Sequence, residues 1–536
     1  MVNAAQKSCW AVLVLGLAVL TATAALRSAE YDEQYTLFLT AGVARPVWPD
    51  SPFPAGAVRA LQGGQGSLVG IARDLRATDV HPPLYFWSVA LWRRLTGGGL
   101  FAARLFSVLC GMAALGAVGV IARRTGVPPA PAMLLTLGCY GFAYTAAIAR
   151  GFALAQALTL WGVAMALCGR RGWAGMLLGA ATFANYLAVF VALTGLALRT
   201  GEAAGRRIAG EREDIGPAGC RPDHPHPHPY PRRRRGWTLS ALAGEGFFGL
   251  FLVADLWFFL AQRTSRAGQF PPFQAGAAVV RLARYAAANL FGGLPLYVPA
   301  GAQAAATGAF ALLALATAAL IAVRWRGIAA SAGARRLLLA AALAPPAGLL
   351  ALGAVFRNTP IELRYLAFAT PFAALLVAGA VGTFPAPPRR AAIAVLAAIQ
   401  AASLAGLMTR AETMQPARAT AAAAARLAGG GIVLLPHGND GVGIVGALAI
   451  ESPPAQRLLV VARGETAAQI RVRLGTARRV VLALLAQDDD SRATIPVLRA
   501  AFAAPCWRRI GDGFNVIAFD RVCDEGAPWD SSTASP

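Results

Sequence analysis

The chain of 536 residues is far more apolar than a soluble protein, with 57% hydrophobic and 14% charged residues and a mean hydropathy of +0.53. Soluble domains carry about a quarter charged residues, and several uncharged runs here reach the roughly 20 residues that a membrane-spanning helix needs. The net charge of +23 is almost all arginine, much of it in short loops between apolar runs, as the positive-inside rule expects. We therefore predict a polytopic helical membrane protein and no nucleic-acid partner.

The membrane region begins at Cys9–Leu26, an uncharged run that follows Lys7. This run suits either a cleaved signal peptide or a retained anchor. We favour an anchor with its N-terminus in the cytoplasm, because several more apolar runs follow. Residues 27–101 then predict a large outer loop, in which His81–Leu95 forms a helix along the outer surface, with its aromatic residues at the membrane interface.

Further membrane crossings of roughly 20 residues each are expected along the next 300 or so residues. The total number of crossings, with the first, is about eleven. Residues 172–198 are too long for one span and are predicted to form two short helices that meet near Asn185. The crossings lie at Ala102–Ala122, Pro131–Ala149, Phe152–Cys168, Gly172–Leu198, Thr238–Ala261, Leu296–Val323, Leu337–Phe356, Leu363–Phe384 and Ala391–Met408. With this threading the arginine clusters between spans all fall in the cytoplasm.

The largest cytoplasmic segment is a basic loop at residues 199–236, which contains the run Asp223–Arg235 of alternating histidine and proline. Such a run could bind a metal ion, but proline holds the chain extended. We predict a disordered basic loop. The next crossing carries Glu245 and Asp255, and ionisable residues inside a membrane are costly and often functional. Asp255, nearer the outer end, could face an active-site cavity.

Beyond the last crossing the sequence changes to alternating strand and helix patterns, which favours a small α/β domain. Its expected strands are Gly431–Pro436, Leu458–Ala462, Arg479–Leu485 and Phe514–Phe519. Its expected helices are Thr466–Leu474 and Ala493–Ala503. We predict a membrane domain at residues 1–408, an extracytoplasmic α/β domain at 409–524 and a disordered tail at 525–536. Cys506 and Cys523 lie in this domain, either as free thiols or as a disulfide.

Adjacent acids, Asp32 and Glu33, stand where the first span leaves the membrane. A carboxylate there could accept a proton from an attacking hydroxyl as a general base. Taken alone, however, paired acids at a helix end are usually no more than solvated charge.

Five short sequence motifs, which follow one another along the membrane region, strengthen the functional interpretation of these acids. They are YDEQYTLFLTAG at 31–42, HPPLYFW at 81–87, FAARLFSVLCG at 101–111, YGFAYTAAIARGFAL at 140–154 and ELRYLAFATPF at 362–372. Together they resemble the GT-C superfamily of membrane glycosyltransferases that use polyprenyl-phosphate-linked sugars. The likeness is closest to the bacterial branch related to protein O-mannosyltransferases and lipid A aminoarabinose transferases. The C-terminal domain resembles only a variable accessory.

The resemblance implies that Asp32 is the catalytic base of an inverting transfer and that Glu33 assists it by positioning. It also implies that His81 lies near the lipid phosphate of the donor. The sequence departs from the family pattern at Ala149, where an acid often stands, and at Phe152, which replaces a tyrosine. Some relatives use a divalent metal and others do not, so no cofactor is certain and a metal site is unknown.

The predicted topology adds cationic candidates to this site. Arg104, Arg150 and Arg364, the last with Tyr365 beside it, all fall at outer helix ends on the side of Asp32. A guanidinium binds phosphate through two parallel hydrogen bonds, so these arginines could stabilise the charge on a leaving lipid phosphate. They are equally compatible with anchors at the membrane interface.

The expected function is therefore a glycosyltransferase of the bacterial inner membrane that works on the periplasmic face. Its partners would be a polyprenyl-phosphate sugar and a lipid, polysaccharide or protein acceptor of the envelope. The alternative is a transporter or flippase of lipid-linked sugars, which usually shows internal repeats with broken helices; no such repeat is visible. A third possibility is a degenerate member that keeps the fold and tolerates loss of Asp32.

Overall fold

The computed structural model describes residues 4–195, 239–263, 270–293, 295, 298–410, 416–503 and 505–523. They divide into two compact units. The first unit comprises Met1–Leu26, Leu68–Trp92 and Phe101–Arg410, and the second comprises Arg27–Ser67, Arg93–Leu100 and Ala411–Pro536. The second unit thus joins most of the first outer loop to the C-terminal segment, whereas the sequence predicted a division near residue 408.

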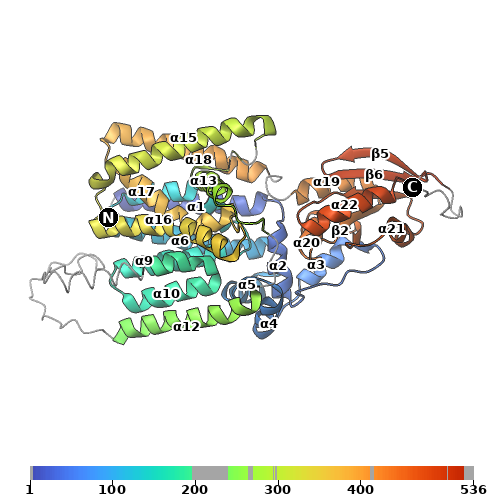
Figure 1. The fold of residues 1–536 in the computed structure, drawn as a ribbon, viewed down its shortest axis with the longest axis horizontal. Helices are drawn as coiled ribbons and strands as arrows, with labels where there is room; N and C mark the ends of the chain where they lie inside the picture. The colour runs from blue at the N-terminus through green and yellow to red at the C-terminus, as the bar shows by residue number, and fades with distance from the viewer. Residues whose placement is uncertain are drawn as a thin grey trace, which may run out of the picture. The chain divides into compact units, whose positions relative to one another are not determined.

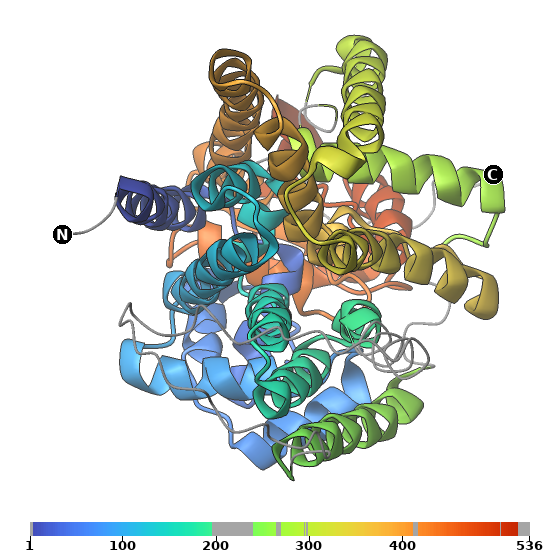
Figure 2. The same cartoon turned by 90° about the vertical axis from the view of Figure 1, so that its left-hand side faces the viewer.

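The first unit is a bundle of helices, many of which run side by side (Figure 1) and are seen nearly end-on in Figure 2. Six helices are long and apolar enough to cross a membrane, and four shorter apolar helices accompany them in the described part of the chain. The helices are α1 (Ala4–Leu26), α4 (Leu68–Thr78), α5 (Leu84–Thr96), α6 (Leu100–Thr125), α7 (Pro129–Gly138), α8 (Tyr140–Ala146), α9 (Phe152–Leu167), α10 (Arg171–Ala184), η1 (Tyr186–Ala188), α12 (Leu239–Gln262), α13 (Ala275–Phe291), α15 (Ala300–Arg324), η2 (Trp325–Gly327), α16 (Ala332–Phe356), η3 (Leu363–Phe368), α17 (Thr370–Gly382) and α18 (Ala386–Thr409). The predicted polytopic helical architecture is confirmed.

Several of these helices are broken where the sequence predicted one continuous span. The expected crossing Pro131–Ala149 ends as α7 at Gly138, passes through the extended residue Cys139 and restarts as α8. The side-chain amide of Gln400, from α18, donates to the carbonyl of Leu135 at 3.1 Å near this break. The same carbonyl accepts from the Cys139 amide at 3.1 Å, so Gln400 is an additional donor at the break. A partner 265 residues away cannot be read from the local sequence.

A second expected crossing, Leu363–Phe384, begins with the 3-10 turn η3 and becomes α-helical only at Thr370. Asn289 of α13 holds this turn, because its side-chain nitrogen donates to the carbonyl of Leu363 at 2.5 Å and its oxygen accepts from the Thr370 hydroxyl at 3.1 Å. The break predicted at Asn185 is present, and this residue caps η1 by accepting from the Leu187 amide. Between the predicted crossings Thr238–Ala261 and Leu296–Val323, the chain forms the 17-residue helix α13.

The second unit contains a six-stranded sheet in the order β1-β3-β2-β4-β6-β5, of which β2, β3 and β4 run parallel. Its elements are α2 (Tyr31–Ala41), β1 (Phe53–Pro54), α3 (Ala55–Gln62), α19 (Ala417–Ala428), β2 (Ile432–Pro436), α20 (Gly443–Glu451), β3 (Arg457–Val461), α21 (Ala467–Leu474), β4 (Arg479–Ala483), α22 (Asp489–Ala501), β5 (Trp507–Gly513) and β6 (Val516–Arg521). All five residues of β2 are buried, as expected for a strand with both faces covered. The four predicted strands and the α/β character are confirmed.

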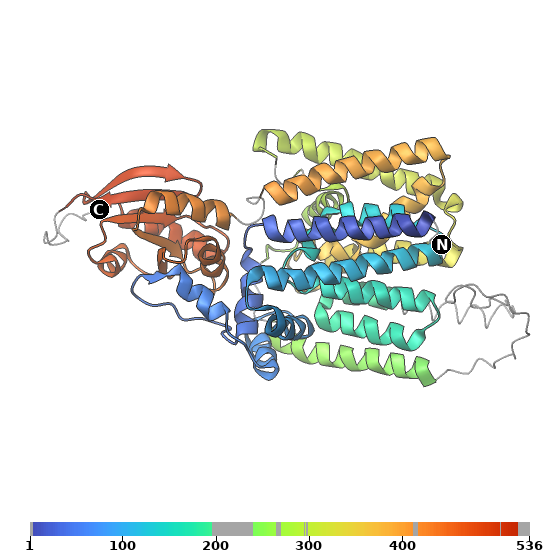
Figure 3. The same cartoon turned by 180° about the vertical axis from the view of Figure 1, so that it is seen from behind.

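The first outer loop completes this sheet. Phe53 and Pro54 form β1, which pairs antiparallel with β3 at the sheet edge. The following helix, α3, packs against α20, and the guanidinium of Arg59 donates to the carbonyls of Ala449, Ile450 and Ser452. A cation at the C-terminal carbonyls of a helix satisfies groups that have no partner within the helix. The loop is therefore built into the second unit. Figure 3 shows the same elements from behind.

Arg93 is a buried side chain that connects several segments of the first outer loop through hydrogen bonds. Its guanidinium donates to the carbonyls of Leu37 (3.0 Å) and Gly98 (2.7 Å) and to Thr40 and the Gln62 carbonyl, which join the ends of α2 and α3. The side chain is 4% exposed, and burial lowers the pKa of Arg93 to about 10. The group therefore remains charged at neutral pH.

We expect Arg93→Ala to lower the free energy of unfolding by at least about 3 kcal/mol, because it removes the hydrogen bonds that a buried, charged donor makes to Leu37, Thr40, Gln62 and Gly98, and a hydrogen bond to a charged group contributes about 1.5–3 kcal/mol. The melting temperature of the detergent-solubilised protein measures this. Arg94→Ala is the matched control, since Arg94 is exposed and a surface change of this kind costs about 0.5 kcal/mol or less. Equal melting temperatures for the two variants would contradict the role given to Arg93.

Cys506 and Cys523 form a disulfide that joins the start of β5 to the end of β6 and closes a sequence separation of 17 residues. In the chain-entropy account a loop of about 15 residues is worth about 3 kcal/mol. We expect Cys523→Ser to lower the melting temperature, whereas Cys168→Ser, at a cysteine that forms no disulfide, should not. Thiol titration of the denatured chain should find five of its seven cysteines reactive before reduction and all seven after it; seven before reduction would contradict the pairing.

Candidate active site

Asp32 and Glu33 occupy the first turn of α2, and both side chains are buried, Asp32 at 7% exposure. Acidic side chains are stabilised at this end of a helix by its dipole. Glu30 is the N-cap, and its own carboxylate forms a buried ion pair with Arg27. The predicted acidic pair is thus part of a dense cluster of charges at the start of α2.

The two acids differ in their local roles. Glu33 completes a capping box, because its Oε2 accepts from the Glu30 amide at 3.0 Å while the Glu30 side chain accepts from the Glu33 amide. That arrangement satisfies two helix-end amides reciprocally. Glu33 therefore has a structural function that the sequence analysis did not foresee. A positioning role for Glu33 and a catalytic role for Asp32 remain predictions.

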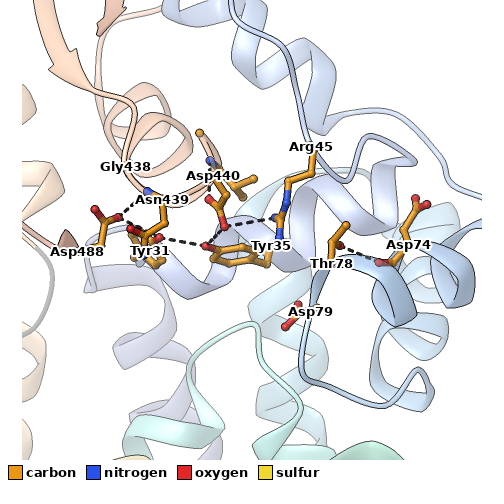
Figure 4. A network of polar contacts seen from close by, with 12 residues as sticks. Tyr31, Tyr35, Arg45, Asp74, Thr78, Asp79, Gly438, Asn439, Asp440 and Asp488 are labelled. Atoms are coloured by element: carbon orange, nitrogen blue, oxygen red, sulfur yellow. Dashed lines mark hydrogen bonds and ion pairs between the residues drawn. The ribbon is translucent and has the colours of Figure 1, made fainter. Parts of the chain in front are cut away.

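One face of α2 is tied to the C-terminal segment by hydroxyl groups (Figure 4). Tyr31 donates to Asp488 Oδ2 at 3.2 Å, and Tyr35 contacts Asp440 Oδ2 at 2.5 Å as well as the Tyr31 hydroxyl at 3.0 Å. Arg45 pairs with the same Asp440 oxygen at 3.4 Å. Sequence reasoning missed these residues. The four-residue spacing of the tyrosines was the one available signal, and it does not identify the partners.

In the first unit, the structure brings His81 and Arg150 together. Arg150 Nη2 lies 3.2 Å from His81 Nε2, and His81 Nδ1 lies 2.9 Å from Asp79 Oδ1. A carboxylate accepts, so Nδ1 carries the proton toward Asp79. Arg150 Nη2 is also 3.3 Å from His81 Nδ1, so it lies against the imidazole ring at nearly equal distances from the two ring nitrogens. Arg150 is 3% exposed and also lies over the Phe86 ring, 6.0 Å from its centroid. This chain of contacts fixes a buried cation in the segment between α8 and α9.

The backbone at His81 is held by the end of α12. Gln262 Nε2 donates to the His81 carbonyl at 3.0 Å and to the Leu75 carbonyl at 2.9 Å, and Gln262 Oε1 accepts from the Tyr186 hydroxyl at 2.8 Å. Seven residues earlier on α12, Asp255 is also buried, whereas Glu245 is exposed. A role of Asp255 toward substrate remains a prediction.

Arg364 and Tyr365 lie in η3. Arg364 forms an ion pair with Glu362 at 2.5 Å, and its guanidinium lies over the Tyr365 ring at 5.7 Å. The Tyr365 ring stacks on Phe152, with 6.2 Å between centroids. Because Phe152 follows Arg150 by two residues, the stacking links the two predicted arginine segments.

Arg104 has a different environment. It is 2% exposed and donates from Nη1 to the carbonyl of Ala24 at 2.8 Å, near the C-terminal end of α1. This contact gives Arg104 a structural role, and a role toward the lipid phosphate remains a prediction. In the described ranges, no three or more His, Cys, Asp or Glu side chains gather as a metal site. The histidine–proline run at residues 223–235, like the tail at 525–536, lies outside those ranges.

The candidate residues fall in both units: buried acids lie on α2 in the second unit, and the buried Arg150 lies in the helical first unit. No protein-family model and no curated protein matches the chain. Crystal structures of ArnT from Cupriavidus metallidurans are similar to it. The form bound to undecaprenyl phosphate has 13% identity, covers 98% of both chains and gives a TM-score of 0.49. The apo form has 12% identity, covers 96% of this chain and 98% of that chain, and gives 0.48.

The function proposed below rests on the residues of this chain.

Proposed function

We propose that the chain is an integral membrane glycosyltransferase that moves a sugar from a polyprenyl-phosphate donor to an envelope acceptor on the periplasmic face. The observation that carries the proposal is Arg150, a guanidinium 3% exposed that is held against His81 between two short membrane helices. Burying a charge is costly unless it is paired, and a fixed guanidinium matches the two oxygens of a phosphate group. Arg364 and Tyr365 are connected to this segment, because the Tyr365 ring stacks on the buried Phe152 and the Arg364 guanidinium lies over Tyr365.

The proposed chemistry assigns one task to each kind of group. Asp32 takes the proton of the acceptor hydroxyl as that oxygen forms a bond to the anomeric carbon, with inversion. The bond between the anomeric carbon and the lipid phosphate oxygen breaks, and the electron pair leaves with the phosphate. Arg150 stabilises the charge that develops there, which is the kind of fixed electrostatic contribution that lowers barriers most.

The location of the second unit on the periplasmic side is supported by chemistry. The Cys506–Cys523 disulfide belongs to this unit, and disulfides form and persist in oxidising compartments such as the periplasm. Asp32 belongs to the same unit by the division of the chain. A reaction on that face would meet acceptors of the cell envelope.

The test offers the purified protein, in nanodiscs, a panel of polyprenyl-phosphate sugars with envelope glycolipids as acceptors, and measures release of the free lipid phosphate. Undecaprenyl phosphate itself serves as the binding probe. Release that requires an acceptor supports the transferase. Movement of intact lipid-linked sugar across a vesicle bilayer, without release, would overturn it in favour of a transporter. Parallel reactions with EDTA and with added Mg²⁺ measure metal dependence.

A further inference from the structure

The C-terminal part of the second unit contacts α2, the helix that carries Asp32, along a single face. Tyr31, Gln34 and Tyr35 stand at positions i, i+3 and i+4, which lie on one side of a helix. The two tyrosine hydroxyls reach carboxylates of the C-terminal segment, Asp488 and Asp440 (Figure 4). Asp32 follows Tyr31 directly, about 100° around the helix axis.

Each of these carboxylates joins α2 to the backbone of the C-terminal segment. Asp488 caps α22 through Ser491, and its Oδ2 accepts both from Tyr31 and from the Asn439 amide at 3.1 Å. Asp440 uses Oδ1 for the Val442 amide at 3.1 Å, which leaves Oδ2 for Tyr35. Both carboxylates are thus positioned by hydrogen bonds within the C-terminal segment, independently of their contacts with the tyrosines.

Two glycines of α20 let α2 approach closely. A Cβ atom built on Gly443 would lie 2.3 Å from the Tyr31 ring, and one on Gly446 would lie 2.7 Å from Gln34 Oε1. Real Cβ contacts are never so short, so any larger residue would displace α2. Gln34 is held further by Gln62, whose side-chain nitrogen donates to Gln34 Oε1 at 2.8 Å.

We propose that the C-terminal α/β segment is a positioning element of the transferase, in which Asp440 and Asp488 hold the tyrosines of α2 and thereby fix the direction in which Asp32 points. This proposal rests on the proposed function. Tyr35 and Asp440 act through the helix and are positioning residues. A misplacement of about 1 Å can cost about 10²-fold in rate when it alters the reacting geometry.

The test compares Tyr35→Phe, Asp440→Asn and the double variant in the full-length protein. The phenylalanine keeps the ring against Tyr31 and Arg45, and the asparagine keeps an oxygen for the Val442 amide. We expect kcat to fall about 10- to 100-fold in each single variant, with the donor KM unchanged. The double variant should lose less than the product of the two single losses, because both single variants remove the shared contact between Tyr35 and Asp440. Tyr35→Phe also removes the contact with the Tyr31 hydroxyl, and Asp440→Asn also removes the ion pair with Arg45.

Hydrogen exchange of the peptide that covers α2 gives a second readout that needs no activity. Exchange should be faster in all three variants. The matched control is Asp520→Asn, which removes the ion pair of Asp520 with Arg479 at 2.7 Å in the same unit. Arg479 holds the pKa of Asp520 below its ordinary value, so this control variant also loses a charged contact. We nevertheless expect its kcat and the hydrogen exchange of α2 to remain those of the wild type.

Wild-type kcat and wild-type exchange in Tyr35→Phe and Asp440→Asn would overturn the proposal, as would an equal loss of kcat in Asp520→Asn. A wild type that releases no lipid phosphate from any donor would instead count against the proposed function. In that case faster exchange of α2 in the variants would still support the tie between α2 and the two carboxylates.

Discussion

Asp32→Asn is expected to reduce transfer by about 10²- to 10⁴-fold, the range that a general base contributes. Asparagine has nearly the same shape as aspartate and can accept hydrogen bonds, but it cannot take the acceptor proton. Binding of the lipid-linked donor should be unchanged, because the substitution removes no group proposed to touch the phosphate. Release of free lipid phosphate and donor affinity, measured on the same preparation, check both statements.

Glu33→Gln is the matched control for Asp32→Asn. Glutamine can still accept from the Glu30 amide, so the capping box should survive and the melting temperature should change little. We expect activity well above that of Asp32→Asn. Equal loss of activity in the two variants would contradict the assignment of the general base to Asp32. Wild-type kcat in Asp32→Asn would indicate a degenerate family member or a transporter.

Arg150→Ala is expected to lower kcat by about 10²- to 10³-fold, as when one fixed donor is removed from a developing anion. It should also weaken binding of undecaprenyl phosphate, since the same guanidinium would contact the phosphate in the ground state. Arg150→Lys keeps the charge and loses the planar fork, and should fall between the wild type and the alanine variant. Steady-state kinetics and binding to the lipid phosphate measure the two effects.

Arg104→Met compares a second buried arginine with Arg150. Arg104 donates to the Ala24 carbonyl, so its removal should lower the melting temperature, and a fall in kcat of the protein that remains folded would support its predicted role at the phosphate. A lower melting temperature with normal kcat in Arg150→Ala would contradict a role of Arg150 at the phosphate. His81→Gln tests whether His81 holds Arg150 in place. We expect this variant to lose less kcat than Arg150→Ala.

Local patterns were sufficient for much of the fold. The break at Asn185 and the strands at Ile432–Pro436 and Arg479–Ala483 follow from run length and apolar clustering. The break at Cys139 does not, since the uncharged run continues through it and the local sequence gives no sign that Gln400 of a distant helix donates to the Leu135 carbonyl beside it. Local sequence reports what a segment can do alone, and the tertiary partner determines where a helix can stop inside the membrane.

The same division holds for the candidate site. The motifs singled out Asp32, His81, Arg150 and Arg364, and the structure places His81 against Arg150. It also gives Arg104 a contact with the end of α1, which a positive charge at an outer helix end does not reveal. Nothing in the sequence around Tyr35 indicates Asp440, because a hydroxyl and a carboxylate 405 residues apart meet only through the fold.

The sequence by itself determined the membrane class, the α/β character of the C-terminal segment and the residue types available for chemistry, because hydrophobic run length and strand or helix periodicity act over a few residues. The tertiary structure alone decided that Phe53 and Pro54 complete the C-terminal sheet and that α2 packs on α20. Both depend on hydrogen bonds and close packing between segments some 400 residues apart, for which a single sequence carries no local signal.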